Sequence, residues 1–174
     1  MITTVEEAVR LGADAVSIGI IIGSTRQAEQ ISQAGVFVRE ARMMGMPTVA
    51  HIYPRGELIP EEEHTSMEQV RYAVRVGAEI GIDIIKTLYT GSAESFSKVV
   101  EACPAYVVAA GGVEASDGRS FLNKAKEVVD AGGAGLACGR FVWNYTNTPA
   151  LVCALKHIIH EDGTVAEACK LLED

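Results

Sequence analysis

Short runs of β-branched and apolar residues alternate with longer stretches of helical periodicity along the whole chain. The short runs read as continuous apolar stretches without a strict alternation of polar residues, which is typical of strands that are covered on both faces. A repeated strand–helix–strand order produces right-handed βαβ units and a parallel sheet. We therefore expect an α/β fold with strands at residues 13–23, 47–53, 83–88, 105–110 and 134–139.

The stretches between these runs carry apolar residues at helical spacing. Ser92 is a candidate N-cap, and Thr164 with Glu167 has the spacing of a capping box. Glycines that follow the helices, such as Gly81, are suited to end them and return the chain to the next strand. The expected helices cover residues 25–44, a segment from Met67 onward, 92–102, 117–131, 149–160 and 164–172, and residues 1–12 resemble the end of another helix.

The number of strands is small for a closed barrel. A (β/α)₈ TIM barrel has eight strands and typically about 250 residues, whereas this chain has 174 residues and five expected strands. No linker or low-complexity tract divides it. We therefore predict one domain over residues 1–174, with the fold of a TIM barrel truncated at its N-terminus to about five βα units. An open sheet exposes apolar interior and two edges, so we also expect a homo-oligomer.

Composition excludes several classes of partner. The net charge is −8 and no cluster of lysine and arginine is present, so we expect neither nucleic acid nor an anionic membrane surface as a partner. No segment reaches about 18 consecutive apolar residues, and the first residues lack the features of a secretory signal. The cysteines show no CxxC spacing, which favours reduced thiols in a cytoplasmic protein.

The sequence also gives no support for a metal or a cofactor. His157 and His160 lie three residues apart on an expected helix, but no third ligand has a suitable spacing, so a solvated helix face is the favoured interpretation. Neither a GxGxxG motif nor a Walker loop is present. We therefore predict that the protein uses no metal and no cofactor.

Lys86 ends an apolar strand with no other charged residue between it and Asp83. Lysine is seldom buried, and removal of water from an ammonium favours the neutral amine, which attacks carbonyl groups to form a Schiff base. The alternative is a lysine whose stem packs while its ammonium reaches solvent. The residues of this strand alone leave both interpretations open.

In parallel α/β folds the functional residues gather at the carboxyl ends of the strands. Tyr53 ends the second expected strand and is a candidate general acid or base, on the expectation that a neighbouring ammonium lowers the pKa of its phenol. Two glycine-containing ends, Gly111-Gly112 and Gly139-Arg140, are candidates for holding a phosphate through backbone N–H groups.

Each of these positions also has a structural interpretation. Gly111-Gly112 is consistent with a tight turn, and Arg140 with a surface ion pair. Tyr53 could be a packing residue with a solvated hydroxyl, and His51 a core histidine with satisfied hydrogen bonds.

Four segments taken together resemble the DeoC/FbaB/LacD class I aldolases. They are residues 45–56 (GMPTVAHIYPRG), 83–91 (DIIKTLYTG), 107–112 (VVAAGG) and 133–140 (GAGLACGR). The resemblance extends over residues 5–172 and is strongest to the archaeal-type fructose-bisphosphate aldolases and to 2-amino-3,7-dideoxy-D-threo-hept-6-ulosonate synthase. By this resemblance the first three barrel strands, with an Asp-His-Gly motif, are missing from the chain.

The resemblance implies an aldol reaction on a phosphorylated sugar, with fructose 1,6-bisphosphate as the expected substrate. It implies that Lys86 forms the Schiff base and that Tyr53 transfers the proton. It further implies phosphate-binding residues at Gly111, Gly112, Gly139 and Arg140. His51, a candidate substrate contact, stands where the fructose-bisphosphate aldolases usually carry an aromatic residue. Two alternatives are a heptulosonate synthase-type transaldolase and a catalytically impaired remnant that binds sugar phosphates or self-associates.

Overall fold

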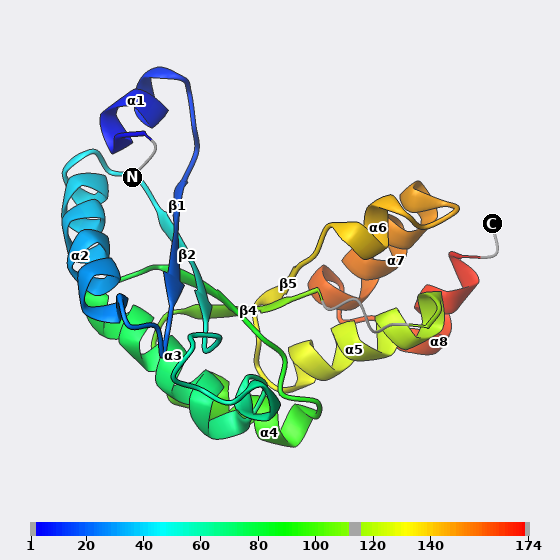
Figure 1. Cartoon of the computed structure of the whole chain (residues 1–174). Helices are drawn as coiled ribbons and strands as arrows, with labels where there is room; N and C mark the ends of the chain where they lie inside the picture. Colours follow the sequence, from blue (N-terminus) through cyan, green and yellow to red (C-terminus); the bar gives the residue numbers. More distant parts are fainter. Residues whose placement is uncertain (1–2, 112–115, 173–174) are drawn as a thin grey trace.

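Five parallel strands form one sheet in the order in which they occur along the chain. The computed structural model describes residues 3–111 and 116–172. The sheet is curved, and its helices lie along the convex side, so the concave side is open (Figure 1). The strands are β1 (Val16–Ile21), β2 (Thr48–Tyr53), β3 (Ile84–Thr87), β4 (Tyr106–Ala110) and β5 (Gly135–Ala137), which confirms the five predicted strands with shorter ends.

Each predicted helix is also present. Helices α2 to α5 follow the first four strands and pack against the sheet and against one another. The 3₁₀ turn η1 (Glu61–Glu63) and the short helix α6 were not predicted, because elements of three or four residues leave no periodic pattern. The helices are α1 (Val5–Arg10), α2 (Gln27–Met43), α3 (Met67–Ile80), α4 (Ala93–Glu101), α5 (Gly118–Asp130), α6 (Arg140–Trp143), α7 (Thr148–His160) and α8 (Val165–Lys170).

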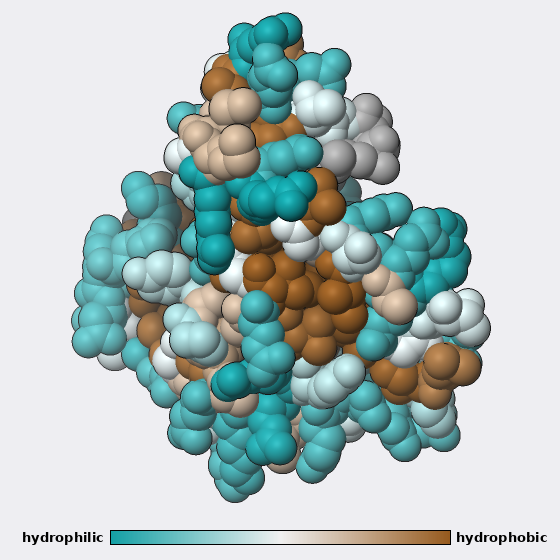
Figure 2. Space-filling model, turned by 90° about the vertical axis from the view of Figure 1, so that its left-hand side faces the viewer, coloured by the Kyte–Doolittle hydropathy of each residue, from teal (hydrophilic) through white to brown (hydrophobic). Residues whose placement is uncertain are grey.

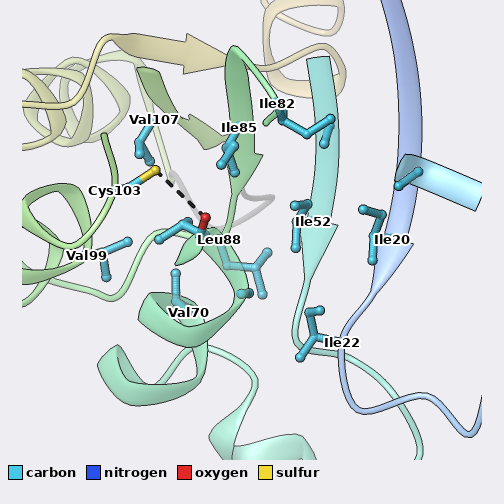
Figure 3. Close-up of a cluster of buried hydrophobic side chains, with 14 of the residues drawn as sticks. Ile20, Ile22, Ile52, Val70, Ile82, Ile85, Leu88, Val99, Cys103 and Val107 are labelled. Atoms are coloured by element: carbon cyan, nitrogen blue, oxygen red, sulfur yellow. Dashed lines mark hydrogen bonds between the residues drawn. The ribbon is translucent and has the colours of Figure 1, made fainter. Parts of the chain in front are cut away.

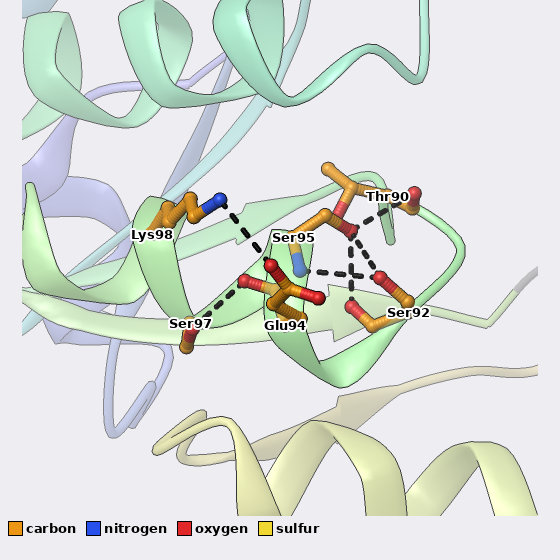
Figure 4. Close-up of polar contacts among 6 residues, drawn as sticks. All are labelled: Thr90, Ser92, Glu94, Ser95, Ser97 and Lys98. Atoms are coloured by element: carbon orange, nitrogen blue, oxygen red, sulfur yellow. Dashed lines mark hydrogen bonds and ion pairs between the residues drawn. The ribbon is translucent and has the colours of Figure 1, made fainter.

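The start of α4 is fixed by a group of hydroxyl contacts. The side chain of Ser92 accepts a hydrogen bond from the backbone N–H of Ser95 at 3.2 Å, and the Ser95 hydroxyl lies 2.7 Å from that of Thr90 (Figure 4). The predicted N-cap at Ser92 is thereby confirmed, as is the capping box of Thr164 and Glu167. These contacts anchor the loop that joins β3 to α4.

The core lies between the convex face of the sheet and the helices. Ile20, Ile52 and Ile85 come from three adjacent strands, and each is fully buried. They face Val70 of α3, and the thiol of Cys103 donates a hydrogen bond to the carbonyl of Val74 at 3.8 Å (Figure 3). A second cluster, centred on Phe121 and Leu122, joins α5 to α7 and α8.

The turn after α3 depends on a glycine. Gly81 caps α3 with a φ of 95°, in the left-handed region, and donates its N–H to the carbonyls of Gly77 and Ala78. Glycine has no Cβ to oppose this conformation. The turn leads directly to Asp83 and β3, as the sequence predicted.

The first edge of the sheet carries an apolar groove. A cavity of about 530 Å³ lies among α1, β1 and α2 and includes Val5, Ile18 and Phe37 in its wall. The side of the molecule that bears α1 and α2 also exposes apolar side chains, among them Met43 at 78% (Figure 2). Among the helices of the described residues, none is both long and apolar enough to cross a membrane.

Candidate active site

A cavity of about 450 Å³ opens at the carboxyl ends of the strands. Four cationic side chains line it in a chain whose net charge is −8. No aspartate or glutamate belongs to the wall formed by the described residues, so an anion entering the cavity meets positive charge and no carboxylate of that wall. The lining residues are Tyr53, Arg55, Thr65, Lys86, Leu88, Tyr89, Ala110, Gly111, Lys124, Ala137, Gly139, Arg140 and Trp143.

Lys86 projects into this cavity because of its position in β3. Ile85 and Thr87 are buried on the helix side of the strand, so the period of two places Lys86 on the open concave face. Its side chain forms no ion pair with any residue from 3–111 or 116–172. Lys86 is therefore a half-buried amine at the wall of an otherwise cationic cavity.

Tyr53 is the last residue of β2 and lines the same cavity. Burial raises the pKa of its phenol, and the nearby Arg55 guanidinium offsets only part of that rise. The expectation that a neighbouring cation would lower this pKa was wrong, since loss of hydration outweighs the charge. Arg55 lies 5.5 Å from the centre of the Tyr53 ring. Because the net effect is a raised pKa, the Tyr53 phenol keeps its proton at neutral pH.

The loop that carries Tyr53 and Arg55 is tied to the end of β1. The Gly56 N–H donates to the Ile22 carbonyl at 2.9 Å. A Cβ at Gly56 would overlap the backbone of Gly23, so this close approach requires a glycine. The Glu57 carboxylate also accepts hydrogen bonds from the hydroxyl of Thr25 and from its N–H. Two adjacent loops thus hold one another at the rim of the cavity.

Two of the predicted glycine positions, Gly111 and Gly139, line the same cavity. Gly111 donates its N–H to the Ala137 carbonyl at 3.2 Å, and a Cβ at Gly111 would overlap the Cβ of Cys138. Close packing between two strand ends is thus enough to require glycine at Gly111. Gly139 also lines the cavity, whereas Gly112 lies outside the described residues.

Arg140 begins α6, is exposed, and lines the cavity beside Gly139. It forms no salt bridge with the residues that the structure describes. The alternative interpretation of a surface ion pair therefore has no support there.

Among the wall residues that the sequence analysis did not single out are Tyr89 and Lys124. The Tyr89 hydroxyl donates a hydrogen bond to the Glu127 carboxylate at 2.7 Å, and the Lys124 ammonium lies 5.2 Å from the centre of the Tyr89 ring. Burial, followed by this hydrogen bond, raises the pKa of Tyr89. Tyr89 lies only three positions after Lys86, which is the one signal that could have drawn attention to it.

His51 lies on the concave face of β2, where its Cα is in register with that of Lys86. It is half-buried and is not part of the cavity wall among the described residues. Burial is the largest cause of a lowered pKa of its imidazole, followed by the positive charge of Lys86. No hydrogen bond contributes to this shift, which disfavours the interpretation of His51 as a core histidine with satisfied hydrogen bonds.

Within residues 3–111 and 116–172, no group of three or more histidine, cysteine, aspartate or glutamate side chains has an arrangement that could hold a metal ion. His157 instead pairs with the Glu161 carboxylate at 2.8 Å.

Comparisons with known proteins agree with this fold. The sequence profile of the DeoC/LacD family aldolases matches residues 1–145. A 2-amino-3,7-dideoxy-D-threo-hept-6-ulosonate synthase from Halobacterium salinarum is 40% identical over 92% of this chain. A 2-amino-4,5-dihydroxy-6-oxo-7-(phosphonooxy)heptanoate synthase from Streptomyces griseus is 34% identical over 94% of it. The chain spans 59% of the length of each of these two relatives.

Solved structures show the same arrangement. An archaeal fructose 1,6-bisphosphate aldolase matches 91% of this chain with a TM-score of 0.86 and 34% identity, over 62% of its own length. A Schiff base-forming fructose-1,6-bisphosphate aldolase matches 91% with a TM-score of 0.87 and 32% identity, over 63% of its length. The five βα units thus have the arrangement of a TIM-barrel aldolase, which confirms the predicted fold class. With a family profile that matches most of its length, the chain belongs to the DeoC/LacD family of aldolases.

Proposed function

We propose that this chain forms or cleaves a carbon–carbon bond in a phosphorylated sugar by a class I aldol reaction. The observation that carries the proposal is the placement of Lys86 on the wall of a cavity that holds three other cations and no described carboxylate. An amine there can react with a carbonyl, while the surrounding cations bind the phosphate of the same substrate.

In the proposed reaction the neutral amine of Lys86 adds to the substrate ketone, and water leaves to give an iminium ion. The iminium accepts the electron pair of the breaking bond in the cleavage direction and becomes an enamine. Tyr53 donates a hydrogen bond to the reacting oxygen and gives it a proton when the bond forms; the proton returns when the bond breaks. The raised pKa of Tyr53 supports this role, because the phenol is protonated at neutral pH.

Phosphate binding is proposed for the cationic wall of the cavity. Arg140 and Lys124 supply charge, and Gly111 and Gly139 line the same cavity. Gly112 is proposed for the same role from the family resemblance. We propose fructose 1,6-bisphosphate as the substrate, supported by the solved structures at 34% and 32% identity.

A second candidate is the transaldolase reaction of a heptulosonate synthase. The names of two relatives, at 40% and 34% identity, favour it. Both candidates use the same imine and differ in what the enamine attacks. Product analysis with a sugar phosphate donor and different acceptor aldehydes separates them. A third candidate is binding of a sugar phosphate without turnover.

Reductive trapping tests the proposal. Sodium borohydride added with dihydroxyacetone phosphate reduces an imine to a stable secondary amine, which is seen as added mass on the intact protein. Lys86→Met should abolish the adduct. Lys124→Met changes another lysine of the same wall and should still form it. Equal adduct in wild type and Lys86→Met would refute the assignment, and adduct without turnover would support the third candidate.

A further inference from the structure

His51 and Lys86 occupy equivalent positions on neighbouring strands. Their Cα atoms are register partners in the parallel pair of β2 and β3, and side chains in register point to the same face of a sheet. The burial pattern agrees, because Ala50 and Ile52 are fully buried on the helix side while His51 is half-exposed. The imidazole therefore lies beside the stem of the lysine.

The space next to His51 is open on the side of β1. The register partner of His51 on that strand is Gly19, and a Cβ built at Gly19 would meet no atom within 4 Å. The imidazole is thus accessible from the concave side as well as facing Lys86, and a small molecule bound to the lysine has room beside the ring.

Few groups on this face can transfer protons. On β2 and β3 the titratable side chains of this face are His51, Tyr53 and Lys86. On β1 the register positions are Gly19 and Ile21, which do not titrate. From β4 the register position is Val108, with Tyr106 two residues before it, and the thiol of Cys138 follows β5. These strand positions of the described chain include no carboxylate.

Two proton-transfer groups on this face, Tyr53 and His51, differ in protonation. Tyr53 has a raised pKa and keeps its proton at neutral pH. His51 has a pKa lowered below its usual 6.5 and is largely neutral there, with a nitrogen lone pair available. Burial also raises the pKa of the Cys138 thiol. His51 is therefore the base and Tyr53 the acid of this part of the sheet.

From this placement we infer that His51 is the general base of imine formation on Lys86. The inference rests on the proposed function. When the amine adds to the ketone, the new C–N bond leaves a positive nitrogen and an alkoxide. The Tyr53 phenol protonates the alkoxide to a hydroxyl, and His51 takes one proton from the nitrogen. The resulting imidazolium gives that proton to the carbinolamine hydroxyl, which departs as water while the nitrogen lone pair forms the C=N bond of the iminium ion. His51 ends the step neutral, and Tyr53 ends it as a phenolate that regains its proton from solvent.

The test measures the rate of adduct formation instead of its yield. Wild type, His51→Gln and the control His160→Gln are mixed with dihydroxyacetone phosphate at several pH values between 5 and 8. Each reaction is quenched with borohydride at successive times, and the fraction of protein that carries the adduct is measured by mass spectrometry. His160 is exposed on α7, outside the cavity wall. We expect the rate in His51→Gln to fall about 100-fold or more, with partial recovery when imidazole is added, and no change in His160→Gln.

The pH profile of the adduct-formation rate gives a second measurement. The wild-type rate should rise through an inflection below pH 6.5 that coincides with the titration of His51 followed by NMR, and this inflection should be absent in His51→Gln. An unchanged rate and profile in a folded His51→Gln would overturn the inference while leaving Lys86 as the nucleophile. Absence of any adduct in wild type would overturn the proposed function and this inference together.

Discussion

Two buried threonines offer the same substitution with opposite expected results. Thr48 and Thr87 are 1% and 0% exposed, respectively. The Thr48 hydroxyl donates to the Asp83 carboxylate at 2.6 Å and accepts from the Asp83 N–H at 3.1 Å. The Thr87 hydroxyl has no hydrogen-bond partner within the part of the chain that the structure describes. Threonine and valine have nearly the same shape, so the change to valine mainly removes a hydroxyl.

The expected magnitudes follow from these contacts. An unpartnered buried hydroxyl costs about 1–3 kcal/mol, so Thr87→Val should raise the free energy of unfolding by about 1 kcal/mol or more. Thr48→Val loses a hydrogen bond to a charged group, typically about 1.5–3 kcal/mol. Because Asp83 is exposed and water can replace part of that bond, we expect a net loss of about 1–2 kcal/mol.

Urea and thermal unfolding of both variants, followed by circular dichroism, measure the effect. A change of 1 kcal/mol shifts the melting temperature by about 2–4 °C in a domain of this size, so the two variants should move in opposite directions from wild type. The Thr48 hydroxyl is the main cause of a lowered pKa of Asp83; the pKa in Thr48→Val should therefore rise toward the usual 3.8. Equal destabilisation by both substitutions would refute the reasoning from hydrogen-bond partners.

Two further predictions concern other parts of the fold. The Glu161 carboxylate is the main cause of a raised pKa of His157, so the pair should stabilise the fold fully below pH 6.5 and lose this effect as pH rises through the folded-state pKa. Urea midpoints of wild type and His157→Gln should therefore differ most at low pH and converge at high pH, and a constant difference would contradict the ion pair. Gly111→Ala should destabilise by about 1–3 kcal/mol through overlap with Cys138. Gly19→Ala, with open space around it, should change stability by no more than about 0.5 kcal/mol, and equal effects in thermal melts would refute the packing argument.

The elements of the fold could be predicted because their signals are local. The cap at Ser92 involves residues within three positions of it, and the stop at Gly81 needs only a glycine after an amphipathic helix. Helix α6 has four residues, too few to produce a period, and it was missed. Local patterns of this kind do not predict how closely two segments that are distant in the sequence approach each other in the fold.

Only the residues of the candidate site that lie at the carboxyl ends of strands could be predicted from the sequence. Lys86, Tyr53 and Gly139 were found in this way, and they line one cavity. Lys124 was missed because it comes from the middle of α5 and reaches the cavity beside Tyr89, which belongs to a different βα unit. The direction of the pKa shift of Tyr53 was wrong because burial, which the sequence does not show, outweighs the charge of Arg55.

The location of a trapped adduct tests the central claim most directly. Trypsin cleaves unmodified protein after Arg75, Lys86 and Lys98, but a lysine converted to a secondary amine carrying a sugar phosphate resists cleavage. After borohydride reduction with dihydroxyacetone phosphate, the added mass should appear in a peptide of residues 76–98 that is absent from the unreacted digest. An adduct found on Lys124 or another lysine, with residues 76–86 released unmodified, would contradict the assignment of Lys86 as the nucleophile.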